Sequence, residues 1–211
     1  MRVLVVMAAA VHADVELAPA AGVFQYYDAG AAPDLQPFAV SARAGFAAGA
    51  AARWERETTA WEFDGRYRDY RGEAFWGGAE ARAAYYFHPT PARPYVAPAV
   101  GFARAGENGA SADFGTLGVR VGGVLVAAGR PLTVDVFGEY RALIKLGRDH
   151  LQPAFSSELG AGGRCWWKPT AHLGLFVEAG VTWPGYFADR HESPTGADVL
   201  PYVLAGPALG L

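Results

Sequence analysis

The residues best suited to chemistry lie in two polar stretches of the C-terminal half. Asp149 and His150 are adjacent in one stretch, and Asp189 lies two residues before His191 in the other. A histidine near a carboxylate can act as a general base on a water molecule, with the acid orienting the imidazole. Aspartate and histidine are also ordinary loop residues, and a whole predicted hairpin separates the two pairs. We therefore interpret them as loop residues and expect no enzyme activity, with no catalytic residues.

Aromatic residues and arginines are interleaved in a second candidate segment, residues 58–72 (TTAWEFDGRYRDYRG). Aromatic rings stack on sugars and cations, and guanidinium groups pair with anionic head groups. The segment predicts an exposed loop that binds sugars or anionic lipids. An alternative interpretation makes it a strand extension whose aromatic residues lie at a membrane surface. The candidate binding residues are Trp61, Arg66, Tyr67, Arg68 and Tyr70.

The sequence indicates no metal site and no cofactor. Its one cysteine, Cys165, cannot form an internal disulfide, and the residues around it lack the spacing of metal ligands. The formal net charge of −3 is unlike that of a nucleic-acid-binding protein, which needs a basic patch. We therefore expect neither a cofactor nor a nucleic-acid partner.

The elements that must position these residues show a regular alternation. Between Leu132 and Ala142 small and apolar residues hold one parity, and Asp135, Glu139 and Arg141 fall on the other. Side chains of a strand point alternately to its two faces, so one face is apolar and the other is charged. Repeated segments of this kind indicate a transmembrane β-barrel. Its outward belt should include Leu117, Val119, Val121, Val134, Val136, Leu173, Leu175 and Val177.

Composition agrees with this interpretation. Charged residues make up only 18% of the chain, glycine is frequent (27 residues), and tryptophan and tyrosine collect near the ends of the alternating segments, where interfacial girdles lie. The chain has no run of about eighteen apolar residues, which a membrane helix requires. Residues 1–13 resemble a secretory signal peptide, with Arg2, an apolar stretch and a small-residue cleavage site before Asp14. We predict a barrel domain over residues 14–211.

The number of strands depends on the N-terminal part. Seven segments are clear from the C-terminus, at 73–87, 95–105, 114–128, 132–145, 154–168, 172–183 and 199–211. If residues 15–27 form a strand and 38–54 break at 47–50 into two, the barrel has ten strands. If 38–54 is one strand and 14–37 a periplasmic preface, it has eight, which removes Arg56 from the lipid face. We predict an all-β, closed antiparallel barrel of ten strands, with eight as the alternative.

Parity places acids and arginines inside this barrel in nearly balanced numbers. A barrel of eight to ten strands has little free interior, so these charges must pair across it. We predict that they plug the lumen, with a narrow polar conduit as the alternative. The inward residues are expected to be Glu16, Arg43, Arg53, Glu55, Glu57, Glu80, Arg82, Arg120, Asp135, Glu139, Arg141, Glu158, Arg164 and Glu178.

The stretches VELAPAAGVFQYYD, FAVSARAGF and RPYVAPAVGFARA resemble the small bacterial outer-membrane β-barrel domain family. The resemblance implies a Gram-negative outer-membrane protein that meets outer-membrane lipids, lipopolysaccharide and the barrel-assembly machinery. The ending Ala-Leu-Gly-Leu departs from the family, which usually closes on an aromatic residue. The spacing of Asp189 and His191 is similar to the acid–histidine pair of omptins, but the matching aspartate pair is missing, since 58–72 offers only Asp64 and Asp69.

Three functions follow as hypotheses. The first is a non-enzymatic outer-membrane barrel with a charge-plugged lumen and exposed loops that bind a partner or support the envelope. The second is an omptin-like or lipid-modifying hydrolase of the outer membrane. The third is a soluble calyx for an apolar ligand, which would place the apolar parity inside and the charges outside. The direction in which the apolar parity faces decides between the membrane barrels and the calyx.

Overall fold

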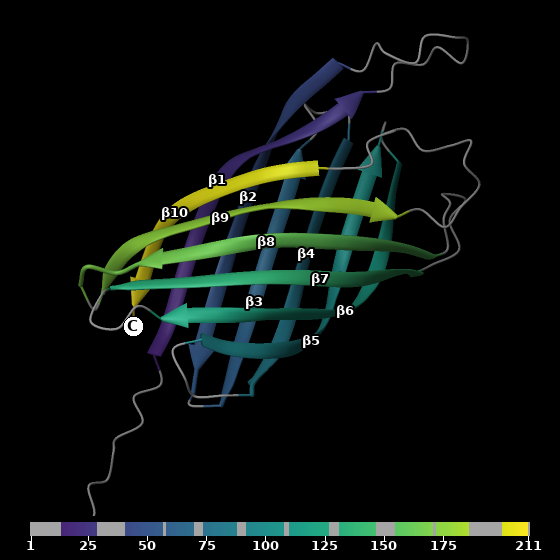
Figure 1. Ribbon diagram of the computed structural model, residues 1–211. Helices are drawn as coiled ribbons and strands as arrows, with labels where there is room; N and C mark the ends of the chain where they lie inside the picture. Colours follow the sequence, from purple (N-terminus) through teal and green to yellow (C-terminus); the bar gives the residue numbers. More distant parts are fainter. Residues whose placement is uncertain are drawn as a thin grey trace, which may run out of the picture.

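The computed structural model describes residues 14–28, 41–56, 58–69, 74–87, 92–107, 110–126, 131–146, 155–170, 172–185 and 200–210. Within these ranges the regular structure consists of ten β-strands (Figure 1). No helix in the described ranges is long and apolar enough to cross a membrane. The strands are β1 (Asp14–Asp28), β2 (Ser41–Glu55), β3 (Thr59–Asp69), β4 (Ala74–Tyr86), β5 (Ala92–Glu107), β6 (Ala110–Val126), β7 (Leu132–Leu146), β8 (Phe155–Trp167), β9 (Leu173–Gly185) and β10 (Leu200–Gly210).

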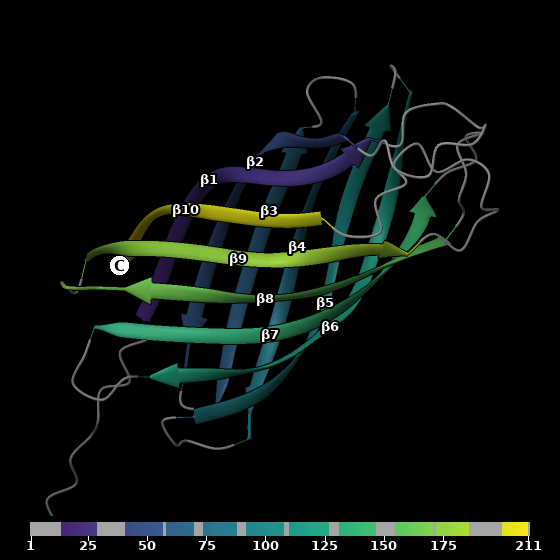
Figure 2. The ribbon, with the colours of Figure 1, turned by 45° about the horizontal axis from the view of Figure 1, so that its top comes forward.

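The ten strands form one closed antiparallel barrel in which each strand pairs with its sequence neighbours and β1 pairs with β10. The strands are strongly tilted, so that β7 to β9 cross β2 to β4 on the opposite wall (Figures 1 and 2). Asp14 lies opposite Glu55 and Glu16 lies opposite Gly210, so the start of β1 and the end of β10 lie at one rim. We call this the terminal rim and the opposite end the far rim. The predicted closed, ten-stranded, antiparallel barrel is confirmed.

The connections between strands differ in length at the two rims. The terminal rim has only short connections, whereas the far rim has both short and long ones. At the terminal rim they are residues 56–58, 87–91, 127–131 and 168–172, and at the far rim 29–40, 70–73, 108–109, 147–154 and 186–199. The predicted segments 95–105 and 114–128 leave too wide an interval between them, because β5 and β6 continue into residues 106–113 and Glu107 pairs with Ala110.

The tenth strand comes from a segment that the sequence analysis assigned to a loop. β2 runs unbroken to Glu55, so the break expected at 47–50 is absent, and residues 14–28 are a strand, not a preface. A short turn, in which the Arg56 N–H donates to the Thr59 carbonyl at 2.7 Å, leads directly into β3. Arg56 is exposed in this turn, with its guanidinium 4.7 Å from the Trp54 ring centroid, so it does not face the middle of the wall.

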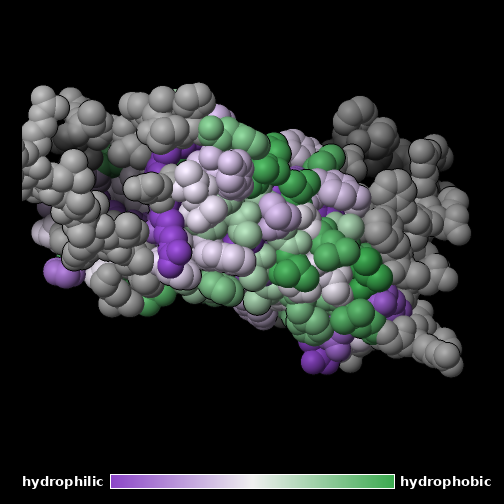
Figure 3. Space-filling model, turned by 90° about the horizontal axis from the view of Figure 1, so that it is seen from below, coloured by the Kyte–Doolittle hydropathy of each residue, from purple (hydrophilic) through white to green (hydrophobic). Residues whose placement is uncertain are grey.

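The apolar parity faces outward. Six residues of the predicted belt are exposed, among them Val136 (56% exposed) and Leu173 (57% exposed). Val134 and Val177 are half-buried, and they flank Cys165 in one row across three strands. Hydrophobic and near-neutral residues cover the middle of the face in Figure 3, and hydrophilic residues gather toward its ends. The protein therefore has the reverse of a soluble calyx's polarity.

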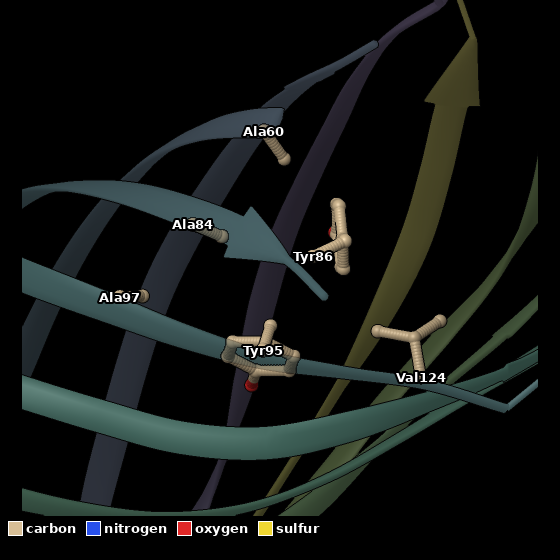
Figure 4. Packing of buried hydrophobic residues seen from close by; sticks show 6 residues of the cluster. All are labelled: Ala60, Ala84, Tyr86, Tyr95, Ala97 and Val124. Atoms are coloured by element: carbon tan, nitrogen blue, oxygen red, sulfur yellow. The ribbon is translucent and has the colours of Figure 1, made fainter. Parts of the chain in front are cut away.

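Apolar side chains fill the two ends of the barrel interior. Near the terminal rim, Tyr86 and Tyr95 pack edge to face with ring centroids 5.9 Å apart, beside Val124 and small alanines (Figure 4). Trp166 and Phe176 pack on the other side of the same end. Toward the far rim the interior holds Phe24, Leu200, Tyr202 and Leu204 on one side and Ala103, Ala112, Phe114 and Leu143 on the other.

Candidate functional site

The middle of the interior holds a set of paired charges, which we call the lumen network. It contains seven arginines and seven acids, so its formal charges balance. At most 10% of each side chain is exposed. The members are Arg53, Arg66, Arg68, Arg82, Arg120, Arg141, Arg164, Glu62, Asp64, Glu80, Asp135, Glu139, Glu158 and Glu178.

Strand register creates much of this network, because opposite charges lie directly across from one another. Arg120 lies opposite Glu139, and its Nη2 is 2.7 Å from the Glu139 Oε2. Arg164 lies opposite Glu178, and its Nε is 2.6 Å from the Glu178 Oε2. Directly opposed charges on one face of a sheet attract one another. These pairs are of the kind expected for inward charges, although the register also places Asp64 opposite the like-charged Glu80.

β3 supplies the centre of the network, which the sequence analysis missed. Asp64 accepts from Arg66 Nε at 3.0 Å, from Arg82 Nη1 at 3.1 Å and from Arg164 Nη2. Alternation in β3 was the signal that could have revealed it, since charges at 62, 64, 66 and 68 alternate with Trp61 and Phe63. The segment was assigned to a loop, and its inward charges were not counted for that reason.

Long arginines also link walls that do not pair. Arg141 of β7 contacts Glu80 of β4, with Nη2 to Oε2 at 3.0 Å, and its Nη1 donates to Glu158 of β8. Arg68 of β3 reaches β8 and β9, with Nη1 3.2 Å from Glu158 Oε1 and Nη2 donating to the Thr182 hydroxyl at 3.2 Å. The Arg141–Glu80 and Arg68–Glu158 contacts cross the lumen and link strands that are not neighbours in the sheet.

Two tyrosines complete the hydrogen bonding of buried acids. The Tyr95 hydroxyl donates to the Asp135 carboxylate, at 2.9 Å from Oδ1, and the Tyr202 hydroxyl donates to Glu178 Oε1 at 2.8 Å. A cavity of about 10 Å³, which has room for about one water molecule, is lined by Glu16, Arg53, Glu62, Arg164 and Trp166 among others. The buried Nε of Arg53 has no hydrogen-bond partner among the described atoms.

The structure separates the four predicted binding residues that it describes. Trp61 and Tyr67 are exposed on the outside of β3, whereas Arg66 and Arg68 point into the lumen, with Arg66 Nη2 2.7 Å from Glu178 Oε1. Tyr70 lies outside the described residues. The expectation of one exposed aromatic and arginine loop is therefore wrong, because the alternation of a strand sends its arginines and aromatics to opposite faces. The alternative of a strand with aromatics at a membrane surface matches β3.

The candidate catalytic residues cannot be placed. Asp149, His150, Asp189 and His191 lie outside the described residues, as do Glu57 and the side chain of Arg43 among the expected inward charges. Within the described part, no three His, Cys, Asp or Glu side chains are grouped so as to hold a metal ion. Of the expected inward residues near the terminal rim, Glu16 pairs with Lys168, and Glu55 pairs with Arg53 and Arg93.

Aromatic side chains flank the apolar exterior at both rims. Outward aromatics near the terminal rim include Trp54, Trp61, Tyr85, Phe87 and Trp167, and those toward the far rim include Phe46, Tyr67, Phe102 and Trp183, whereas Phe63 and Tyr140 lie nearer the middle of their strands. Beyond the second group, Arg104 and Asp113 form an exposed pair at 3.6 Å. The ten steps from Leu125 to Gly115 correspond to a strand rise of about 33 Å. At the tilt of about 40° that is typical of membrane barrels, this rise would span about 25 Å, the height of their apolar band.

Fold and site together define a closed ten-stranded β-barrel with an ion-paired interior and an apolar exterior. No family model and no curated protein matches the chain. Among solved structures, Neisserial surface protein A gives a TM-score of 0.44 at 16% identity, covering 93% of this chain and 96% of that one. The translocator domain of autotransporter NalP from Neisseria meningitidis gives 0.44 at 12% identity, covering 94% and 88%. The transport unit of autotransporter AIDA-I from Escherichia coli gives 0.40 at 10%, covering 97% and 91%.

Proposed function

We propose that the protein is an integral β-barrel of a Gram-negative outer membrane with a sealed lumen and no enzymatic activity. The observation that carries this proposal is the polarity of the wall, with charges paired inside and exposed apolar side chains such as Leu117, Val136 and Leu173 outside. In water such a surface would be a large uncovered apolar area. In a bilayer it contacts lipid, and closure of the barrel satisfies the backbone groups.

The rims give the proposed orientation. Membrane barrels have short periplasmic turns and longer extracellular loops. The terminal rim, with its four short connections, therefore faces the periplasm, and the far rim, with residues 29–40, 147–154 and 186–199, faces the outside. Residues 1–13 act as a cleaved secretory signal. The outward aromatics Trp61 and Tyr67 contact lipids at the two interfaces, and the partners are lipopolysaccharide, other outer-membrane lipids and the barrel-assembly machinery.

The role that this geometry supports best is binding by the far-rim connections or support of the envelope, since the lumen network leaves the interior filled. The hydrolase alternative retains one favourable observation. The connections that hold His150 and His191 leave the far rim on neighbouring hairpins, and Ser157 at the start of β8 pairs with Gly185 at the end of β9. If these connections form an active site, the purified protein hydrolyses outer-membrane lipid or peptide substrates, and His150→Ala and His191→Ala abolish that hydrolysis. We expect the purified protein to show no such hydrolysis.

Two measurements on the full chain test the proposal. Expressed in a Gram-negative host, the protein should fractionate with the outer membrane and migrate differently on gels before and after boiling in SDS, as a folded barrel does. Reconstituted in planar bilayers, it should give no steady ion conductance. Recovery in the soluble fraction contradicts the membrane assignment, and a steady conductance of porin size contradicts the sealed lumen.

A further inference from the structure

The hydrogen-bonded ladder of the described strands is interrupted at two places, and both interruptions lie at prolines. Between β4 and β5 the pairing lapses from Ala83 to Ala84, where Pro98 faces Ala83. Between β1 and β10 it lapses over residues 18–20 and 206–208, where Pro19 faces Pro207. The remaining strand pairs have continuous registers. The second interruption lies where the ends of the sheet meet to close the barrel.

Opposed prolines remove more of a ladder than a single proline does. In an antiparallel pair, residues alternate between positions that exchange two N–H···O=C bonds and positions that exchange none. Pro19 and Pro207 occupy an exchanging position, and neither has an N–H, so both bonds are missing. At Pro98 the partner Ala83 keeps its N–H, so one bond is lost. Within sheets, prolines are found mainly on edge strands, where no neighbour needs their N–H. Here the two proline-bearing strands, β1 and β10, are the first and last strands of the sheet, and they pair with each other to close the barrel.

Across this seam the side chains make apolar contacts but no ion pairs. Toward the far rim, Phe24 of β1 packs with Leu200, Tyr202 and Leu204 of β10. β10 has no charged residue, so it forms no ion pair with β1 comparable to those that join β6 to β7 or β8 to β9. Behind the gap the interior is lined by the small side chains Ala18, Ala20 and Ala208, packed against Trp166 and Phe176. The lumen network and the apolar clusters at its two ends, by contrast, fill the route along the barrel axis.

We propose that the barrel opens at the β1–β10 seam, and that exchange between its interior and its surroundings goes laterally between Pro19 and Pro207 instead of along the axis. At this seam two hydrogen bonds are missing, β10 carries no charge, and the interior side chains directly behind the gap are small alanines. This inference goes beyond the proposed function, which needs only a closed wall. Opening the β6–β7 or the β8–β9 seam would instead break a continuous ladder and a buried ion pair.

Amide hydrogen exchange of the full chain in lipid nanodiscs, resolved by NMR, tests the proposal. The amides of Ala21 and Ala205 point across the seam next to the gap, whereas those of Val119 and Tyr140 lie in the continuous β6–β7 ladder. We expect exchange at Ala21 and Ala205 to be at least about tenfold faster. The double variant Pro19→Ala/Pro207→Ala restores two hydrogen bonds and should slow it about thirty-fold. Equal protection at the two places, or no change in the double variant, overturns the proposal.

Two further variants separate seam opening from a general effect on the barrel. Pro98→Ala should slow exchange only beside the β4–β5 interruption and leave Ala21 and Ala205 unchanged. In a Cys165→Ser background, Ala21→Cys/Ala205→Cys joins the seam by a disulfide between directly paired residues, whose Cα separation of about 5.5 Å suits such a bond. Oxidation should suppress exchange at the seam, whereas a Leu117→Cys/Ala142→Cys disulfide in the β6–β7 ladder should not. Unchanged seam exchange after oxidation contradicts lateral opening.

Discussion

Replacing Arg164 by methionine should destabilise the barrel more than any single change on its outer surface. Its guanidinium contacts Glu178 Oε2 at 2.6 Å, Glu62 Oε2 at 3.3 Å and the Asp64 carboxylate, and only 2% of the side chain is exposed. Methionine keeps much of the volume and removes the charge, so one buried negative charge in the network remains unbalanced. Breaking a buried pair in this way costs about 3–5 kcal/mol.

Two matched variants separate the effect of the charge from the effect of the substitution. Arg104→Met removes an arginine from the exposed pair with Asp113, whose side chains are 57% and 42% exposed, and should cost about 0–1 kcal/mol. Arg164→Met combined with Glu178→Leu removes one charge of each sign, so the network stays balanced. The double variant should therefore cost less than the two single variants together.

Urea unfolding in phospholipid vesicles, followed by tryptophan fluorescence and by the folded band on SDS gels, measures these free energies. A cost for Arg164→Met no larger than that of Arg104→Met would refute the reasoning, because it would mean that water solvates the lumen charges.

Other changes have equally definite expectations. A Cβ at Gly206 would lie 1.9 Å from the Pro19 carbonyl oxygen, so Gly206→Ala should cost at least about 1–3 kcal/mol, whereas Gly123→Ala meets no atom within 4 Å and should be neutral or slightly stabilising by urea unfolding. Tyr95→Phe removes the hydroxyl that donates to buried Asp135 and should cost about 1.5–3 kcal/mol, while Tyr140→Phe on the exposed face should change the unfolding free energy by less than about 0.5 kcal/mol. Equal effects within either pair would contradict the assigned contacts.

Alternation made most of the wall predictable from sequence. The outward belt from Leu117 to Val177 and the charges on β7, β8 and β9 follow from the fixed period of two in a strand, which needs no knowledge of neighbours. Strand ends were harder, because turn residues such as Arg56 and Thr58 also occur in loops. The charges of β3 made its residues look like a loop, although their parity was that of a strand.

Contacts that span the lumen could not be predicted. The links from Arg141 to Glu80 and from Arg68 to Glu158 join strands that are not neighbours, so they depend on the tilt and diameter of the closed barrel. The opposition of Pro19 and Pro207 likewise depends on the register with which the first and last strands close. Neither quantity can be read from a local pattern, since each is set by the whole sheet.

Collision accessibility of spin labels on β6 tests the central claim, the outward apolar face, most directly. In a Cys165→Ser background, nitroxides placed one at a time by Leu117→Cys, Val119→Cys and Val121→Cys in phospholipid vesicles report whether lipid or water surrounds each outward position. All three side chains are exposed on the barrel wall. We expect ready access for oxygen, which dissolves in lipid, and little for a water-soluble nickel chelate. Ready access of the chelate to all three positions would contradict a membrane-embedded wall.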